Sequence, residues 1–248
     1  MIDKNKYIQF EDLNNDPNVI HFYTKKPLNF NPEMIEESVI SEEYKEVLKS
    51  LNYQSKKIIK PNQKHTNIVK KVEYSNINDR FDNTDGLITN LKDVALVTST
   101  ADCQAILLYD FNKKVIGNIH SGWRGTANRI IENAINIMIN DYNCNSKDIK
   151  AYICPSILKC CFEVEEEVKE EFISKFKDID ISDLIKKEEN KYKIDLVAIN
   201  IKVMKKLGIL EQNIVKSNIC TKCNANKYHS YRGDGVICGR NIAYIALK

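Results

Sequence analysis

Short runs of apolar residues, separated by polar turns, occupy the middle of the chain. Val94–Thr98, Gln104–Tyr109 and Val115–Ile119 are rich in Val, Ile and Leu, and each run ends in polar or turn-forming residues. This pattern is typical of buried β-strands. Cys103 and His120 border these runs, so we expect both side chains at strand ends, where a loop can present them.

The same reasoning predicts strands and helices along the rest of the chain. The further predicted strands are Tyr7–Phe10, Val19–Tyr23, Ile58–Ile59, Ile68–Val72, Tyr152–Cys154 and Ile242–Leu247. Apolar residues at helical spacing predict helices. These are Ser41–Leu51, a helix that opens at the glycine turn Ser121–Gly125 and includes Ile130–Met138, Glu163–Phe176 and Leu196–Leu207. Mixed strand and helix segments indicate an α+β fold.

Some boundaries of these segments carry their own signals. Ser41 and Asp195 are predicted N-caps because their side-chain oxygens can accept from the free N–H groups of a first turn. Gly208 is a typical helix stop. Lys175–Lys193 is highly charged and only weakly periodic, so we expect an exposed excursion there.

The composition limits the classes of function. A net charge of +3, with Lys and Glu interspersed, does not favour a nucleic-acid partner. No run approaches the roughly 18 apolar residues of a membrane span, and the first residues have no apolar signal-peptide core, so we expect a cytoplasmic protein. We interpret residues 1–248 as a single domain and its eight cysteines as thiols or ligands.

The pair Cys103 and His120 allows three interpretations: a nucleophile with its base, two metal ligands, or two core residues. His65, at another predicted loop-to-strand junction, adds a third candidate ligand. A set of two His and one Cys leaves one position open on a tetrahedral zinc ion, as in catalytic sites. The long separations between these residues are unlike those of a local zinc finger, so spacing alone does not decide.

Other polar residues near these runs could complete a site. Gly122 and Arg124 lie in a glycine turn that leads into a helix, an arrangement that favours phosphate. Asp102 could orient an imidazole or accept a proton from substrate, and Asp85 could orient a ligand or only close its turn. Arg232 and Arg240 could bind phosphate or close a subunit interface.

Four of the remaining cysteines occur as two close pairs. Cys160 and Cys161 are interpreted as packing thiols rather than ligands. Cys220 and Cys223 form a CxxC, but no second CxxC or CxxH pair follows at a suitable distance.

Several segments occur in a characteristic order: QKHTNIV, TDGLIT, ADCQAILLYD, HSGWRGT, CPSILKCCFEVEEEV, DLVAINIKVMKKLGI and CTKCNANKYHSYRGDG. They resemble the YfiH/laccase-domain family, the polyphenol oxidase-like purine nucleoside phosphorylases. The resemblance runs from about His21 to the C-terminus. It implies a layered sandwich of mixed β-sheets flanked by helices, and His65, Cys103 and His120 as ligands of a catalytic Zn²⁺.

The resemblance also implies substrates. These are inorganic phosphate and the purine nucleosides adenosine, inosine, guanosine and S-methyl-5′-thioadenosine, with deamination of adenosine as a second activity, in a monomer or homodimer. The family carries a Thr-Arg pair where this chain has Thr24 and Lys25. Lys25 offers phosphate only a mobile point charge in place of the planar fork of Arg.

Three other functions remain open from the residues. A copper-dependent polyphenol oxidase would use the same two His and one Cys, although the motifs contain no Met for a weak axial ligand. A hydrolase would use Cys103 as nucleophile and His120 as base. A metal-stabilised interaction module would need an exposed apolar stripe, which the sequence does not show.

Overall fold

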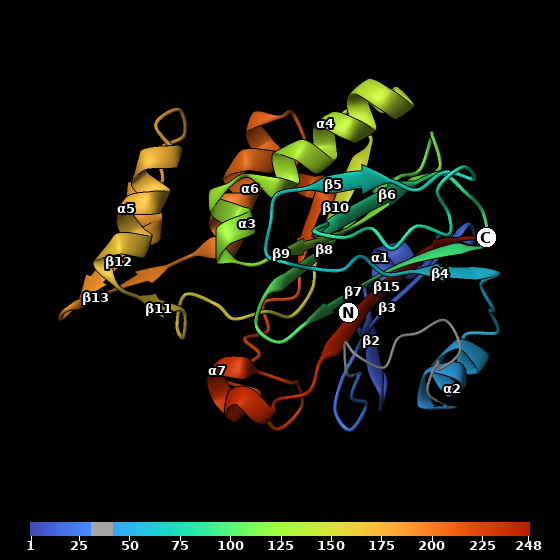
Figure 1. Cartoon of the computed structure of the whole chain (residues 1–248), viewed down its shortest axis with the longest axis horizontal. Helices are drawn as coiled ribbons and strands as arrows, with labels where there is room; N and C mark the ends of the chain where they lie inside the picture. The colour runs from blue at the N-terminus through green and yellow to red at the C-terminus, as the bar shows by residue number, and fades with distance from the viewer. Residues whose placement is uncertain (31–41) are drawn as a thin grey trace.

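The computed structural model describes residues 1–30 and 42–248 of the chain. Two six-stranded sheets pack face to face, and helices lie on both outer sides (Figure 1). The strand order is β1-β2-β3-β15-β7-β4 in the first sheet and β14-β10-β8-β9-β6-β5 in the second. Both sheets contain parallel and antiparallel pairs. The layered sandwich of mixed sheets that the resemblance implied is therefore confirmed.

The strands of the two large sheets have the following bounds. They are β1 (Ile2–Asp3), β2 (Tyr7–Gln9), β3 (Val19–Thr24), β4 (Lys57–Ile59), β5 (Val69–Lys71), β6 (Gly86–Thr89), β7 (Val94–Thr100), β8 (Gln104–Asp110), β9 (Val115–Ser121), β10 (Ile149–Ile153), β14 (Ile214–Lys216) and β15 (Asn241–Leu247). All nine predicted strands are present, with ends that differ by a few residues from those expected. A further small sheet has the order β11-β13-β12.

The helices are α1 (Glu11–Asn14), α2 (Glu42–Ser50), α3 (Trp123–Ala127), α4 (Ile130–Tyr142), α5 (Glu166–Lys175), α6 (Leu196–Lys206) and α7 (Tyr231–Asp234). The Asp195 side chain accepts a hydrogen bond from Ala198 N at 2.9 Å and caps α6, as predicted. Gly208, just beyond α6, has φ +90°, a left-handed conformation that glycine adopts without strain. The predicted cap Ser41 lies outside the described residues.

Alternating side chains of the central strands pack into different layers of the core. On β8, Ala105, Leu107 and Tyr109 face the first sheet. Ile106 and Leu108, between them, face the helices instead. Since successive side chains of a strand point to opposite faces, a strand covered on both sides reads as a continuous apolar run. This explains why β8 and β9 were recognisable in the sequence.

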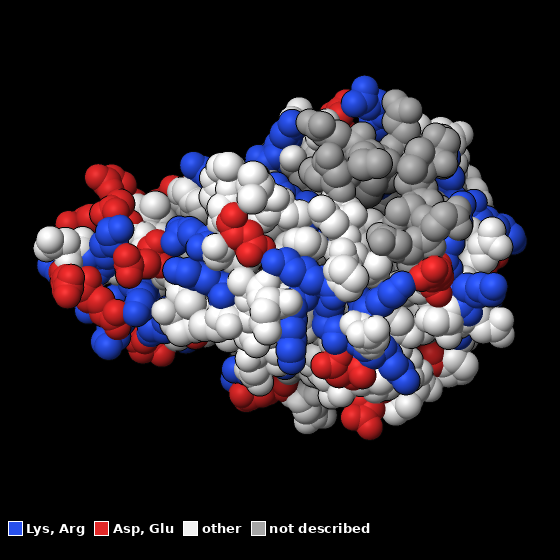
Figure 2. Space-filling model, turned by 90° about the horizontal axis from the view of Figure 1, so that it is seen from below, with Lys and Arg blue, Asp and Glu red and all other residues white. Residues whose placement is uncertain are grey.

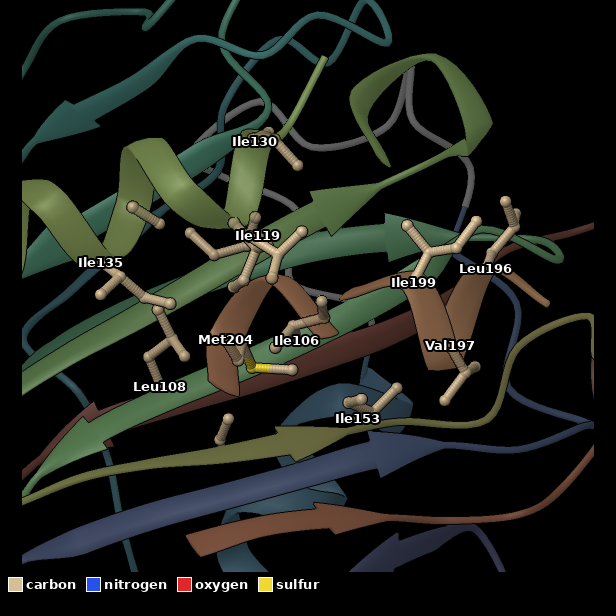
Figure 3. Close-up of a cluster of buried hydrophobic side chains, with 14 of the residues drawn as sticks. Ile106, Leu108, Ile119, Ile130, Ile135, Ile153, Leu196, Val197, Ile199 and Met204 are labelled. Atoms are coloured by element: carbon tan, nitrogen blue, oxygen red, sulfur yellow. The ribbon is translucent and has the colours of Figure 1, made fainter. Parts of the chain in front are cut away.

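Helices α4 and α6 cover the outer face of the second sheet (Figure 3). Ile130 and Ile135 of α4 and Met204 of α6 lie against Ile106 and Ile119 of the sheet. All five side chains are fully buried. This packing holds β8, which begins just after Cys103, and β9, which contains His120.

Two helix predictions are wrong at their N-terminal ends. The helix expected to open at the glycine turn Ser121–Gly125 begins only at Ile130, as α4, and Trp123–Ala127 form the separate short helix α3. Arg129, between the two helices, has φ +57° and lies in the left-handed region. Glu163 and Val164, expected in a helix, form β11, and the helix α5 begins only at Glu166.

The charged segment Lys175–Lys193, predicted as an exposed excursion, is exposed over most of its length. It contains β12 (Ile185–Glu188) and β13 (Lys191–Ile194), which pair antiparallel with each other. Together with β11 (Glu163–Val164) and α5, they form a lobe at the left of Figure 1. Acidic and basic side chains intermix over this lobe, whereas Lys and Arg predominate across the centre of the face in Figure 2. Among the described residues, no helix has the length and apolar content needed to cross a membrane.

Candidate metal centre and surrounding site

Three residues that are far apart in the sequence meet where the two sheets pack together. His65 lies in the loop between β4 and β5, Cys103 in the turn between β7 and β8, and His120 near the end of β9. One ligand atom from each side chain lies within 4.8 Å of the other two. The two imidazole rings meet edge to face, with centroids 5.0 Å apart. His120 is buried, Cys103 is half-buried and His65 is exposed, so the site opens to solvent on the His65 side.

The Asp85 carboxylate contacts the imidazole of His120 and the backbone of His65. His120 Nδ1 lies 2.7 Å from Asp85 Oδ1, and His65 N donates to the same oxygen at 3.0 Å. Lys64 N and Thr66 N donate to Oδ2 at 3.1 and 2.7 Å. Because an ionised carboxylate only accepts, Nδ1 of His120 carries the proton and Nε2 is left as the ligand atom. His65 has φ +59°, and these hydrogen bonds hold its backbone in that conformation.

Gly122 makes room for the three candidate ligands. A Cβ atom at this position would lie 2.9 Å from His65 Cδ2 and 3.0 Å from Cys103 Sγ. Any side chain larger than hydrogen would therefore push the ligands apart. The sequence predicts a phosphate contact for Gly122, and the structure adds a steric role beside the imidazole of His65 and the thiol of Cys103.

Cys103, His120 and Asp85 shift one another's pKa values. Burial disfavours the thiolate of Cys103, but the charge of His120 and hydrogen bonds with His120 and His65 outweigh it and lower the pKa to about 6. Burial also disfavours protonated His120, yet Cys103 and Asp85 raise its pKa to about 9. Burial opposes ionisation of Asp85, but hydrogen bonds from His120 and Thr66 lower its pKa to about 2. A thiolate, the ligand form of Cys, is thus favoured at neutral pH.

The carboxylate of Asp102 contacts the C-terminal part of the chain. Thr221 Oγ1 and Ser230 Oγ each donate to its Oδ1 at 2.6 Å, and Arg232 N donates to Oδ2 at 2.7 Å. Asp102 has φ +87°, so the backbone bends immediately before Cys103. The Asp102 side chain thus contacts residues 221–232, while the Cys103 side chain faces His65 and His120. Asp102 thereby holds residues 221–232 beside the candidate metal ligands.

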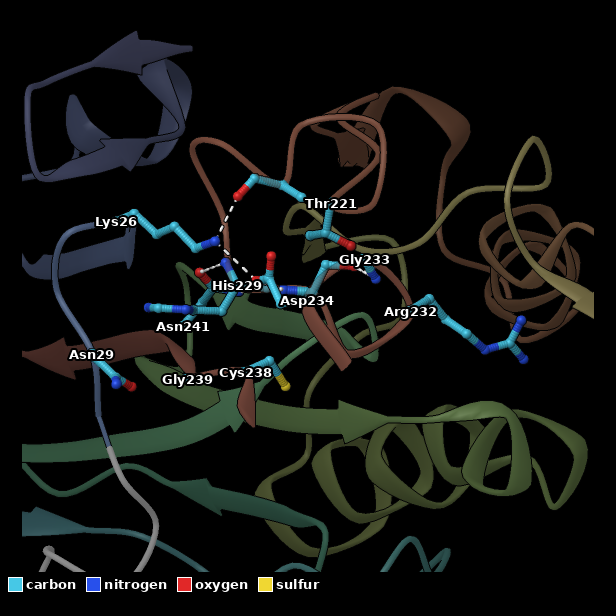
Figure 4. A network of polar contacts seen from close by, with 12 residues as sticks. Lys26, Asn29, Thr221, His229, Arg232, Gly233, Asp234, Cys238, Gly239 and Asn241 are labelled. Atoms are coloured by element: carbon cyan, nitrogen blue, oxygen red, sulfur yellow. Dashed lines mark hydrogen bonds and ion pairs between the residues drawn. The ribbon is translucent and has the colours of Figure 1, made fainter. Parts of the chain in front are cut away.

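The segment that follows is tied to the N-terminal part of the chain (Figure 4). Lys26 Nζ donates to Ala225 O at 2.6 Å and pairs with Asp234 at 2.8 Å. His229 N and O both bond to the side chain of Asn241. These contacts fix the loop between Thr221 and Asn241, which includes α7.

The basic residues predicted to bind phosphate lie in different surroundings. Lys25 is buried and pairs with Asp3. The Arg124 guanidinium lies 4.3 Å from the centroid of the Trp123 ring and is exposed. Arg232 Nη1 donates to Glu163 O at 3.1 Å, and its side chain points away from Asp234 in Figure 4. Arg240 Nη1 donates to the carbonyl oxygens of Cys238 and Gly239 at 3.0 Å.

Lys60 is a basic residue near Arg240 that the sequence did not single out. Burial and the positive charge of Arg240 lower the pKa of Lys60 to about 8. Two cations that repel each other in a partly buried place favour a bound anion. The signal in the sequence is weak, because a single Lys beside Pro61 resembles any surface lysine.

Four of the seven cysteines outside this centre are arranged differently from the prediction. Cys160 is exposed and Cys161 half-buried, and ligand sulfurs of Cys160, Cys161, Cys220 and Cys223 lie within 4.8 Å of one another. The interpretation of Cys160 as a packed thiol is therefore wrong. The CxxC of Cys220 and Cys223 does have a second pair, which precedes it in the chain.

Comparison with known proteins identifies relatives of this chain. Residues 27–248 match the family described as multi-copper polyphenol oxidoreductase laccase. A purine nucleoside phosphorylase of Clostridium acetobutylicum is 32% identical over 251 residues, covering 100% of this chain and 98% of the relative. Adenosine deaminase RL5, from an unknown prokaryotic organism, is 33% identical over 170 residues, or 68% of this chain and 64% of that protein.

A solved structure extends the comparison to the fold. YfiH of Bacillus licheniformis superposes with a TM-score of 0.86 at 25% identity, covering 99% of this chain and 98% of that one. The match thus includes both sheets and the lobe. The chain belongs to the laccase-like YfiH family.

Proposed function

We propose that this chain is a zinc-dependent purine nucleoside phosphorylase that also deaminates adenosine. Its substrates would be inorganic phosphate and adenosine, inosine, guanosine or S-methyl-5′-thioadenosine. The observation that carries the proposal is the convergence of His65, Cys103 and His120 at one solvent-accessible point. The relatives named purine nucleoside phosphorylase and adenosine deaminase support the substrate class.

The donor set fits a catalytic zinc ion. Imidazole nitrogen and thiolate are its ordinary ligands, and three protein ligands leave a fourth position for substrate or water. The hydrogen bond from His120 to Asp85 is the usual support of a metal-bound histidine, since it fixes the ring and its tautomer. When bound, zinc would act as a Lewis acid toward a substrate group at the open position.

The chain's own residues would position phosphate. Phosphorolysis needs an anion held beside C1′ of the ribose while the glycosidic bond breaks. Arg124, which follows Gly122 and is exposed above Trp123, is a candidate for this contact, and Lys60 with Arg240 forms a second positive group. Asp102, bound to Thr221, Ser230 and Arg232 N, would act as a positioning residue that holds one wall of the site.

A copper-dependent polyphenol oxidase is the second candidate, because the family description names one. The chain has four His residues in all. His21 Nε2 accepts from Phe10 N at 2.8 Å, and His229 Nε2 lies 2.9 Å from Leu28 O. Only His65 and His120 thus meet at a metal centre, and a chain with two such imidazoles favours one ion with nitrogen and sulfur ligands over a multi-copper cluster.

A Cys–His hydrolase is favoured by one observation, the lowered pKa of Cys103 beside His120. The two functions differ in how Cys103 reacts. A free nucleophile is alkylated by iodoacetamide with or without a chelator, whereas a ligand is protected until metal is removed. Protection that is lost on chelation would support the metal centre and argue against the hydrolase.

The deciding experiment is a nucleoside panel assayed with and without phosphate on protein whose metal content has been measured. Phosphate-dependent formation of ribose 1-phosphate and free base would support the phosphorylase. Base release that is equally fast without phosphate would replace it by hydrolysis. Oxidation of a phenol only by the copper-loaded protein, with no nucleoside turnover, would favour the oxidase. Cys103→Ala is the matched inactive control.

A further inference from the structure

Four cysteine sulfurs form a second cluster, separate from the candidate catalytic centre. Cys160 and Cys161 lie in the loop after β10, and Cys220 and Cys223 lie in the loop after β14. The Cys223 sulfur is 3.8 Å from that of Cys160 and 3.4 Å from that of Cys161, and all four sulfurs lie within 4.8 Å of one another. Four thiolates at about 2.3 Å from a tetrahedral zinc ion would be about 3.8 Å apart. The observed spacing is close to that figure.

The same distances do not describe disulfides. A disulfide joins its sulfurs at about 2.05 Å, and all eight cysteines of the chain are free thiols in the structure. The sulfurs also converge as a group of four rather than as two separate pairs. Such a convergence is the arrangement of a closed structural site, in which every position of the metal is taken by a protein ligand.

The surroundings of the cluster suit a bound thiolate group. The backbone N–H groups of Leu158 and Cys223 donate to the sulfur of Cys220, and such hydrogen bonds orient and stabilise a metal-bound thiolate. Lys193 lies close enough to Cys161 to interact with its charge. A zinc ion with four thiolates has a net negative charge, which nearby N–H groups and lysines stabilise.

We infer that Cys160, Cys161, Cys220 and Cys223 bind one structural Zn²⁺ ion, in addition to the ion proposed at His65, Cys103 and His120. The site is independent of the proposed nucleoside chemistry because it has no open position. Thiolate-rich sites select soft or borderline ions such as zinc, and iron is the principal competitor.

The proposed ion would join two loops that both contact Asp102. Thr221, between the two ligands of the CxxC, donates to Asp102 Oδ1 at 2.6 Å. Ile157 N, in the loop before Cys160, donates to Asp102 O at 2.8 Å, and Thr221 N donates to Ser156 O at 3.0 Å. The structural ion would therefore stabilise the backbone that leads directly into Cys103.

The first test is metal stoichiometry of the whole chain, purified under reducing conditions and analysed by elemental mass spectrometry. The unchanged chain should hold two zinc ions. The double variant Cys220→Ser/Cys223→Ser should lose one and keep the other, and His65→Ala/His120→Ala should show the complementary loss. Cys238→Ser, a half-buried cysteine outside both clusters, is the matched control and should keep both.

The second test identifies the ligands by replacing zinc with Co²⁺. In the His65→Ala/His120→Ala background, four thiolates should give strong sulfur-to-cobalt charge-transfer absorption and tetrahedral visible bands. Cys160→Ser/Cys161→Ser should abolish both. This second pair also serves if the Cys220→Ser/Cys223→Ser variant does not fold, because Cys160 is exposed and Cys161 is only half-buried.

Three results would overturn the inference. One is a single zinc ion in the unchanged chain that is lost only with His65 and His120. Another is cobalt absorption that the cysteine substitutions leave intact. The third is a loss of two titratable thiols in metal-free, denatured protein, traced by peptide mapping to a disulfide within the cluster.

Discussion

Asp85 Oδ1 lies 2.7 Å from His120 Nδ1 and also accepts the backbone N–H of His65. One carboxylate therefore fixes the ring of one candidate ligand and the backbone of another. The contact is fully buried on the Asp85 side, so water does not compete for it. This makes Asp85 the residue on which the geometry of the proposed metal centre depends most.

Asp85→Asn should weaken metal binding without removing a ligand. The amide keeps the shape of the carboxylate but loses its charge, and it can present an N–H to the proton on His120 Nδ1. Loss of such a support typically costs about 10- to 100-fold in metal affinity. Competition with a chromophoric chelator measures the change. Asp82→Asn is the control, because the Asp82 carboxylate is exposed and accepts a hydrogen bond from Asn62 Nδ2 at 2.9 Å. Equal affinities in both variants would contradict the role of Asp85.

Removing a ligand should abolish both metal and activity. His65→Ala, Cys103→Ala and His120→Ala should each lose the catalytic ion and nucleoside turnover while circular dichroism shows an intact fold. The reason is that two remaining donors cannot hold the ion in a site that also keeps a position open. Full turnover by any of the three variants would argue against the metal centre.

Gly122→Ala should disturb the same centre sterically. The added methyl group would approach His65 Cδ2 to 2.9 Å and Cys103 Sγ to 3.0 Å, so at least one ligand must move. We expect about a tenfold or larger loss of metal affinity, by analogy with other changes that misorient ligands. Gly117→Ala is the control, because Gly117 lies on β9, the strand that ends just before Gly122. Its added methyl group would lie 3.3 Å from Leu108 Cβ and near no candidate ligand. It should cost stability yet leave metal binding unchanged, as thermal unfolding and metal analysis would show.

Arg124→Ala should raise the KM for phosphate about 10- to 100-fold, the range expected when a charged hydrogen bond is lost. The KM for inosine should change little. Arg80→Ala, which removes another exposed guanidinium, is the control. A rise in the KM for inosine alone would place Arg124 at the nucleoside instead of the anion.

Acid should destabilise the fold through His21. Burial lowers the pKa of this imidazole from 6.5 to about 3, and Nδ1 has no partner among the described side-chain contacts. The unfolded chain therefore takes up a proton below pH 6.5 that the folded chain does not. The contribution of the neutral His21 ring to the free energy of unfolding is therefore complete above pH 6.5. Between pH 6.5 and about pH 3 it decreases by about 1.4 kcal/mol per pH unit. Denaturant titrations should show a shallower fall for His21→Asn, and equal slopes would contradict the assignment.

The sequence predicted the central strands well because both of their faces are buried. Continuous apolar runs such as Gln104–Tyr109 have few alternatives to a covered strand. It missed the short helix α3 and the break before α4, where Arg129, a non-glycine residue, adopts a left-handed conformation. Nothing in the identity of Arg129 signals that conformation, because arginine has no preference for it.

The candidate site was predictable as a set of residue types but not as a geometry. His65, Cys103 and His120 stood at strand ends, and the resemblance gave them a shared role. The contacts of Asp85 with both His65 and His120 could not be predicted, because these residues lie 20 and 35 positions away in the sequence. The second cysteine cluster was missed for the same reason: its pairs are 62 and 63 positions apart at the contacting sulfurs.

The placement of His65 after a strand of the first sheet, and of His120 on a strand of the second, has a consequence for maturation. Ligands supplied by both halves of the sandwich come together only after those halves have docked, so a nascent chain offers no ready coordination sphere. Loading is then a late event, coupled to completion of the architecture. Variants that weaken the packing between the two sheets should recover their unfolding temperature as the free zinc concentration rises. An ion that binds only the folded form shifts the folding equilibrium toward that form.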